Sequence, residues 1–129
     1  LQFHGDEDEE FCKHFKRPYI KAVRVQVDTD LGRLCQQYAS AKGLLVDSYK
    51  PGIPGGTGET FDWAMIPRDL PLPLVLAGGL NAENVNAAVV SVKPWAVDVS
   101  SGVELSPGFK DSAKIAGFMR AVANSSGDK

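Results

Sequence analysis

Short apolar runs alternate with amphipathic stretches along this chain, and this alternation limits the fold more than any other feature of the sequence. Apolar and β-branched side chains fill residues 19–27, 44–47, 72–77 and 95–99, and residues 1–5 read as a strand that runs into a turn. Strands that alternate with helical stretches predict βαβ units and a parallel sheet. We therefore expect about five parallel strands with intervening helices.

The stretches between the strands have the spacing of helices. An acidic run at residues 6–10 suits the first turn of a helix that continues to Phe15, and residues 61–65 suit a short helix. Asn81 is placed to cap the helix that follows it. The last helix is expected to begin near residue 110. Apolar side chains at helical spacing predict which faces point inward: Leu31, Leu34, Cys35 and Tyr38, then Val85, Ala88, Val89 and Val92, then Ile115, Phe118, Met119 and Val122.

Length and charge exclude several functional classes. The 129 residues allow one domain, which we place at residues 1–123 with a flexible C-terminal tail at residues 124–129. The 14 basic and 16 acidic residues leave a net charge of −2, so no broad positive field favours a nucleic-acid partner. The longest uncharged apolar stretch, residues 70–80, is shorter than the roughly 20 residues of a membrane span, so no membrane partner is expected.

The two cysteines point to the cytoplasm rather than to a metal site. Cys12 and Cys35 lack the spacing of a disulfide framework or of a zinc site, and we interpret them as reduced, partly buried thiols. No zinc site is expected on this basis.

Glycine-rich or serine-rich segments follow three of the predicted strands. They contain Gly55 and Gly56 within the long loop at residues 48–60, Gly78 and Gly79, and Ser100, Ser101 and Gly102. Glycine lets the backbone approach a ligand closely, and the N–H groups of such loops can bind phosphate. A single loop of this kind is more often a simple turn. Two of them after consecutive strands match the phosphate site formed by the last two βα loops of a (β/α)8 barrel.

Three titratable side chains at strand ends are candidates for the chemistry. Asp47 closes its strand just before the long loop, and Asp98 lies one residue before the end of the strand at residues 95–99. A carboxyl group there faces the usual ligand site of an α/β fold and can act as a proton donor. His4 could hydrogen-bond a ligand. The alternatives are a capping or solvated carboxylate for each aspartate and an ordinary polar contact for the histidine.

Four segments resemble those of one family, phosphoribosylanthranilate isomerase. They begin at Leu1 (L-Q-F-H-G-D-E), at Leu44 (L-L-V-D-S, followed by G-G-T-G-E-T-F-D-W), at Leu76 (L-A-G-G-L-N-A-E-N-V) and at Val97 (V-D-V-S-S-G-V-E, followed by P-G-F-K-D). The resemblance covers essentially the whole chain and corresponds to the fourth to eighth βα units of a (β/α)8 barrel. It implies a chain that is the C-terminal part of such a barrel.

The resemblance implies an Amadori rearrangement in tryptophan biosynthesis, without cofactor or metal. N-(5′-phosphoribosyl)anthranilate would become 1-(o-carboxyphenylamino)-1-deoxyribulose 5-phosphate. Asp47 matches the family's general acid, and the glycines and serines above match positions around the phosphate. The general base implied is a cysteine in a K-I-C-G motif, and an arginine from an early strand would hold the anthranilate carboxylate. The K-I-C-G motif is absent from the 129 residues, and neither Cys12 nor Cys35 fits it.

Two other interpretations stay open. The chain could be a non-catalytic, phosphate-binding half-barrel, stable alone or by forming a homodimer that replaces a missing N-terminal barrel segment. It could also belong to another phosphosugar barrel such as indole-glycerol-phosphate synthase, although that chemistry needs a lysine and glutamates that we cannot place at these strand ends.

Overall fold

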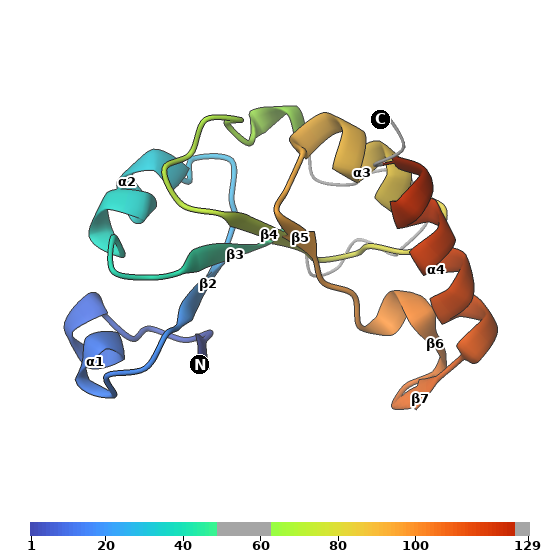
Figure 1. Cartoon of the computed structure of the whole chain (residues 1–129), viewed down its shortest axis with the longest axis horizontal. Helices are drawn as coiled ribbons and strands as arrows, with labels where there is room; N and C mark the ends of the chain where they lie inside the picture. Colours follow the sequence, from blue (N-terminus) through green and yellow to red (C-terminus); the bar gives the residue numbers. More distant parts are fainter. Residues whose placement is uncertain (49–62, 126–129) are drawn as a thin grey trace.

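A computed structural model of the chain describes residues 1–48 and 63–125, which form a curved parallel sheet with helices along its outer side (Figure 1). The five strands of this sheet lie side by side in the order of the sequence. They are β1 (Gln2–Phe3), β2 (Ile20–Arg24), β3 (Gly43–Asp47), β4 (Leu74–Ala77) and β5 (Ala96–Val97). The predicted α/β class and parallel sheet are therefore confirmed.

The connections are helical, as the alternating pattern predicts. They contain α1 (Glu9–His14), α2 (Leu31–Gln37), the 3-10 turn η1 (Trp63–Met65) and α3 (Val85–Val92). After β5 come a second 3-10 turn, η2 (Ser101–Val103), the antiparallel pair β6 (Glu104–Ser106) and β7 (Phe109–Lys110), and α4 (Ser112–Ser125). The sequence did not predict η2 or the β6–β7 pair, because two- and three-residue strands show no measurable periodicity.

Side chains alternate between the two faces of the sheet and give each face a different character. On the outer face, Val46, Leu74 and Leu76 pack into a core with the helices. The inner face carries a smaller cluster that includes Leu45 and Ala77. Successive strand residues point to opposite faces, so every second residue of each strand points, like this cluster, to the concave side of the sheet.

The strand at the far edge is shorter than expected. β5 contains only two residues, and Trp95, expected to begin it, is 76% exposed. Asp98 therefore follows the strand instead of lying within it, although its N–H still donates to the Leu76 carbonyl at 2.8 Å. The physical reason is that β5 is an edge strand, which among the described strands pairs with β4 alone.

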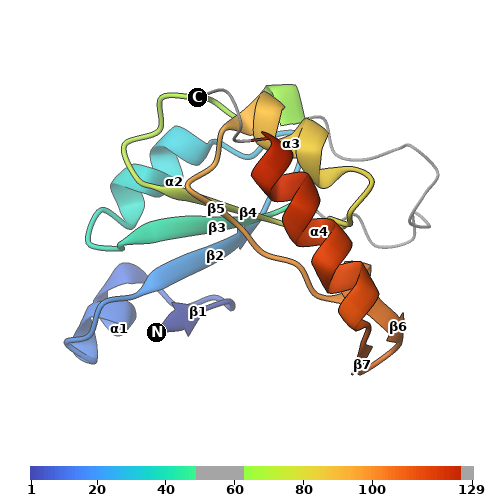
Figure 2. The same ribbon diagram turned by 45° about the vertical axis from the view of Figure 1, so that its right-hand side comes forward.

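The inward face of α4 differs from the prediction. Phe118 is buried and Val122 is partly buried, but Ile115 and Met119 are 41% and 59% exposed. α4 lies beside α3 (Figure 2), and within the described part of the chain its other frequent neighbour is η2. A helix that packs on so few partners buries a narrow stripe, which leaves Ile115 and Met119 beside that stripe rather than in it. The helix continues through Ser125, and residues 126–129 of the expected tail lie outside the described residues.

Both cysteines lie beneath the helical layer. Cys12 on α1 and Cys35 on α2 are free thiols, and both are fully buried rather than partly buried. Among the described residues, no helix combines the length and apolar character needed to cross a bilayer.

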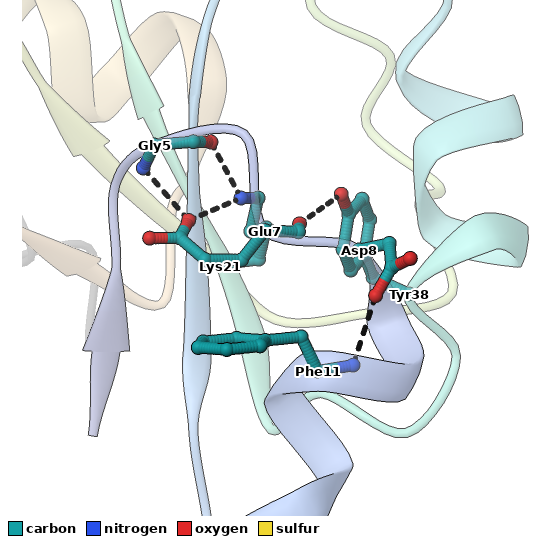
Figure 3. A network of polar contacts seen from close by, with 6 residues as sticks. All are labelled: Gly5, Glu7, Asp8, Phe11, Lys21 and Tyr38. Carbon is teal, nitrogen blue, oxygen red and sulfur yellow. Dashed lines mark hydrogen bonds and ion pairs between the residues drawn. The ribbon is translucent and has the colours of Figure 1, made fainter.

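A buried lysine holds the turn that follows β1 (Figure 3). The Lys21 ammonium group, only 3% exposed, donates to the Gly5 carbonyl at 2.7 Å and to the Glu7 carboxylate at 3.0 Å. Tyr38 donates from its hydroxyl to the Glu7 carbonyl at 2.7 Å, and its ring lies 5.2 Å from the ammonium nitrogen. A charge taken out of water needs such partners. The network therefore fixes the conformation of the β1–α1 turn.

Glycine is required where the segment after β5 meets the segment after β4. A Cβ atom built on Gly102 would lie 1.8 Å from the Leu80 carbonyl oxygen and 3.2 Å from the Asn81 Cα. Both neighbours are backbone atoms, which cannot move aside as a side chain can. The two segments are therefore in direct contact only because residue 102 has no side chain.

Replacing Gly102 by alanine should destabilise the chain by about 1–3 kcal/mol or more, the usual cost of inserting a carbon into packed structure. The matched control is Gly117→Ala on α4, where the added Cβ would lie 3.7 Å from the Ala82 side chain. There the same change should be neutral or stabilising, since alanine favours a helix over glycine. Urea unfolding of the three proteins tests this prediction, and equal midpoints for Gly102→Ala and wild type would contradict it.

The Lys21–Glu7 pair predicts a specific dependence of stability on pH. The hydrogen bond from Lys21, followed by bonds from the backbone N–H groups of Glu7 and Gly5, lowers the Glu7 pKa from 4.5 to about 2. The stabilisation is therefore complete above pH 4.5 and is lost as the pH falls toward 2. In Glu7→Gln this contribution no longer titrates, so its unfolding midpoint should fall less than that of wild type across this window.

The matched control for that experiment is Glu10→Gln, the same change at an exposed position of α1. Its midpoints should follow the wild-type curve. Parallel curves for Glu7→Gln and wild type would show that the ion pair does not stabilise the fold.

Candidate functional site

The carboxyl ends of the five parallel strands surround one cavity of about 420 Å³. Its walls are the last inward-facing residues of the strands and the loops that follow them. The lining residues are Gln2, His4, Ala22, Val23, Arg24, Leu45, Asp47, Ala77, Gly78, Gly79, Leu80, Asp98, Val99, Ser100, Ser101 and Gly102. In an α/β fold this edge of the sheet is where ligands bind.

Asp47 lies at the middle of the rim of this cavity. It is the last residue of β3, two positions after Leu45 on the inner face, and it is half-buried. Its backbone is held from both sides, because its carbonyl accepts from Val25 N–H at 3.1 Å and its Cα pairs with that of Ala77. The carboxyl group is thus presented to the cavity from a rigid strand end.

Ser48, the residue after Asp47, joins the end of β3 to the end of β4. It is buried, its N–H donates to the Ala77 carbonyl at 3.0 Å, and its hydroxyl donates to the same oxygen at 3.1 Å. A further contact of 3.3 Å joins the hydroxyl to the Gly78 carbonyl. The end of β3 is therefore tied to the start of the glycine turn after β4.

The glycine turn after β4 needs its two glycines. Gly78 and Gly79 have φ angles of +94° and +68°, in the left-handed region that other residues rarely adopt. This turn and the segment at residues 100–102 are neighbours, as the close approach of Gly102 to Leu80 shows. Together they wall one end of the cavity with main chain, and the N–H groups of such main chain are suited to a phosphate.

A pair of lysines supports the second of these loops. Lys110 donates to the Ser100 carbonyl at 2.9 Å and contacts the Glu104 carboxylate at 3.3 Å, and Lys114 donates to the Glu104 carbonyl at 2.8 Å. The Asp111 N–H donates to the Val103 carbonyl at 2.9 Å. The P-G-F-K-D motif therefore acts as the support of the loop at residues 100–102, a role that sequence reasoning did not assign.

The described candidates from the sequence all meet in this one cavity. His4 follows β1 and Asp98 follows β5, and both side chains are exposed. They therefore lie at opposite ends of the row of five strands, and Asp47 lies on the central strand. Gly55 and Gly56, with most of the long loop, lie outside the described residues.

Sequence reasoning missed two polar residues that line the cavity, Gln2 and Arg24. Arg24 ends β2, and its Cα is the register partner of that of Asp47. The available signal was the alternation of β2. Because Val23 and Val25 point to the helices, Ala22 and Arg24 point to the inner face.

Neither cysteine is placed to act in the cavity. Cys12 and Cys35 pack in the cluster between the sheet and the first two helices, and burial raises the pKa of both thiols. A thiol must lose its proton to act as a base, so both environments oppose that role. Within residues 1–48 and 63–125, no three His, Cys, Asp or Glu side chains come close enough to hold a metal ion.

Comparison with known proteins gives a consistent result over most of the chain. The family model described as N-(5′phosphoribosyl)anthranilate (PRA) isomerase matches residues 1–121. N-(5′-phosphoribosyl)anthranilate isomerase of Nitrosospira multiformis is 62% identical over 122 residues, and that of Pseudomonas putida is 58% identical over 122 residues. Each alignment covers 95% of this chain but only 59% of the relative.

Solved structures show the same relationship. The crystal structure of phosphoribosyl anthranilate isomerase from Thermotoga maritima superimposes with a TM-score of 0.82 at 43% identity, over 95% of this chain and 60% of that chain. A complex of such an isomerase with reduced 1-(o-carboxyphenylamino)-1-deoxyribulose 5-phosphate gives a TM-score of 0.77 at 40% identity, over 95% and 58% of the two chains.

These matches agree with the residues that shape the cavity. The curved sheet is a portion of a (β/α)8 barrel, and the segments around Asp47, Gly78–Gly79 and Ser100–Gly102 are those whose motifs resemble the family. By sequence and by structure, the chain belongs to the N-(5′-phosphoribosyl)anthranilate isomerase family, and it spans about 59% of the length of the relatives that it matches.

Proposed function

We propose that this chain binds N-(5′-phosphoribosyl)anthranilate in the cavity at its strand ends and supplies the general acid of its isomerisation. One observation carries the proposal: a single cavity joins the Asp47 carboxyl group to the two main-chain loops at residues 78–80 and 100–102. The loops offer backbone donors for the phosphate, and Asp47 is held one strand away from the first of them.

The reaction requires one proton transfer for ring opening, one for enol-amine formation and a final tautomerisation in which C1′ gains a proton and the C2′ hydroxyl group loses one, with no net oxidation. The Asp47 carboxyl group donates a proton to the ribose ring oxygen as the bond from that oxygen to C1′ breaks, and the nitrogen lone pair forms a C=N bond to C1′. A base then removes the C2′ proton, and the resulting enol-amine rearranges to the aminoketose. Anchoring the phosphate in the loops would hold the ribose over the acid throughout.

The base is not assigned to any described residue. Both thiols lie in the outer packing layer, away from the cavity lining, so this chain is proposed to contribute the acid and the phosphate site of the reaction. The second candidate function is phosphate binding without catalysis. The observation that favours it is that no thiol lines the cavity, although His4, Asp47 and Asp98 do.

Asp47→Asn should abolish proton donation while keeping the size of the side chain. If the chain turns over phosphoribosylanthranilate, we expect kcat to fall by at least about 100-fold, the usual contribution of a positioned general acid. Binding of the reduced product analogue should change little, because the loops that hold the phosphate are untouched. Asp69→Asn, an exposed aspartate outside the cavity lining, is the matched control.

Steady-state kinetics and calorimetric binding of the analogue distinguish the outcomes. Equal turnover by wild type and Asp47→Asn would remove Asp47 from the mechanism. Absence of turnover in wild type, with retained binding of the analogue, would instead establish the phosphate-binding part without catalysis.

We further propose that additional polypeptide covers the two open edges of the sheet, either an N-terminal barrel segment or a second copy of the chain. Within residues 1–48 and 63–125, β1 and β5 each pair on one side only, and Leu1, Phe11 and Phe15 expose 59%, 51% and 46% of their surface near β1. Unpaired edges and adjoining apolar surface favour association.

Sedimentation velocity of the chain over a range of concentrations tests this proposal. We expect a dimer or larger species that dissociates on dilution. A monodisperse, fully structured monomer at all concentrations would contradict the expected self-association and exclude a second copy as the covering polypeptide.

A further inference from the structure

We propose that Lys110 is a positioning residue of the phosphate site, because it holds the peptide between Ser100 and Ser101 so that the Ser101 N–H group points into the cavity. The proposal rests on the proposed function, in which the loops after β4 and β5 bind the phosphate of the substrate. It assigns the direction of one donor inside the cavity to a side chain outside it.

The peptide between Ser100 and Ser101 is oriented by a contact from outside the cavity. The Lys110 ammonium group donates to the Ser100 carbonyl at 2.9 Å, whereas Lys110 itself does not line the cavity. The described part of the chain contains no cis peptide bond, and in a trans peptide the carbonyl and the N–H group point in opposite directions. The Ser101 N–H group therefore points away from Lys110, toward the cavity that Ser100 and Ser101 line.

The Ser101 N–H group is available to a ligand. Within residues 1–48 and 63–125 it has no hydrogen-bond partner, and a main-chain N–H group directed into a cavity is suited to a phosphate oxygen. Its direction depends on the ψ angle of Ser100.

No regular secondary structure sets that angle. Ser100 has φ and ψ angles of −127° and −87°, which belong to neither a helix nor a strand. The Val103 N–H approaches the Ser100 carbonyl only at 3.4 Å, beyond the usual range of a strong hydrogen bond. The contact from Lys110 is shorter by half an ångström and comes from a charged donor, so it is the stronger hold on this peptide.

The hairpin of β6 and β7 holds Lys110 in place. The register pairs its Cα with that of Glu104, and the Glu104 carboxylate accepts from the Lys110 ammonium group at 3.3 Å and from the Gly108 N–H at 3.2 Å. The next residue, Asp111, donates from its N–H to the Val103 carbonyl at 2.9 Å. Both ends of the lysine side chain are thus fixed, and the ammonium group is presented to the Ser100 carbonyl.

The Glu104 carboxylate distinguishes two ways in which Lys110 could strengthen phosphate binding. An unpaired cation would attract a phosphate at long range, but the carboxylate 3.3 Å away offsets much of this charge. The hydrogen bond to the Ser100 carbonyl remains, and it acts on the orientation of the peptide. The ratio of variant to wild-type Kd should therefore depend little on salt, which screens attraction between exposed charges.

The test is a titration of the full chain and four variants with reduced 1-(o-carboxyphenylamino)-1-deoxyribulose 5-phosphate. Lys110→Met removes the donor, and Lys110→Arg keeps a cationic donor. Lys114→Met removes the neighbouring cation, which donates to the Glu104 carbonyl instead of to that of Ser100. Lys13→Met, at an exposed position of α1 outside the cavity lining, is the matched control.

Three measurements are made on each protein. Isothermal titration calorimetry gives Kd at low and at high salt, and amide chemical shifts of the ¹⁵N-labelled chain report on Ser101 and on Gly79 of the other loop. Circular dichroism verifies the fold, which we expect every variant to keep, because the Lys110 side chain is 48% exposed and lies outside the packed core.

We expect Lys110→Met to weaken binding by about 10-fold at both salt concentrations, the lower end for one hydrogen bond to a charged group. The shift of the Ser101 amide proton on binding should shrink, while that of Gly79 is kept. A loss confined to one amide distinguishes orientation of a donor from general support of the loop. Lys110→Arg should recover most of the affinity, Lys114→Met should weaken binding far less, and Lys13→Met should match wild type.

The failures of the two proposals are distinguishable. If Lys110→Met binds as tightly as wild type, or loses the shifts of Ser101 and Gly79 alike, the positioning role is overturned while the proposed function stands. An effect that disappears at high salt, or that Lys114→Met shares in full, would overturn it in favour of attraction by charge. If wild type shows no saturable binding, the proposed function itself is overturned, and the role of Lys110 with it.

Discussion

The in-register parallel pairing of β2, β3 and β4 is the constraint on which the rest of the structure depends. Each strand pairs residue for residue with its neighbour, so Arg24, Asp47 and Ala77 end their strands at one level. A shift of one residue would turn every inward side chain to the helical face. Asp47 would then point into the outer core, and the cavity would lose its central carboxyl group.

The loops around the cavity are held by contacts that differ in kind at its two ends. Beyond β4 and β5, main chain packs on main chain where Gly102 meets Leu80, and Lys110 supports the loop from outside. Beyond β1, the buried Lys21 holds Gly5 and Glu7 of the turn that directly follows His4 (Figure 3). Both arrangements act by excluding alternative loop conformations, which is how a rigid scaffold positions a binding site.

The sequence predicted the order of strands and helices because periodicity is a local property. Of the predicted stripe, Val85, Ala88 and Val92 are buried and Val89 is partly buried. Polar residues at strand ends meet at one edge because parallel strands run in one direction. Ile115 and Met119 show the limit of the same reasoning. Helical spacing identifies which residues share a face, but not whether a neighbouring element is there to cover it.

The site was predicted less completely than the fold. Asp47, His4 and Asp98 were found because they are titratable residues at strand ends. Arg24 was missed because a charged residue inside an apolar strand looks like an exposed position until its register with Asp47 is known. Ser48 and Lys110 were missed because their role is to hold backbone carbonyls, and the partners of such hydrogen bonds are distant in the sequence.

The central claim is that the cavity at the strand ends binds a phosphorylated ligand through the loops after β4 and β5. The most direct measurement is a titration of the ¹⁵N-labelled chain with reduced 1-(o-carboxyphenylamino)-1-deoxyribulose 5-phosphate, followed by amide chemical shifts. The account predicts saturable shifts that are largest at residues 78–80 and 100–102. Saturable shifts confined to other parts of the chain, or none at all, would contradict it.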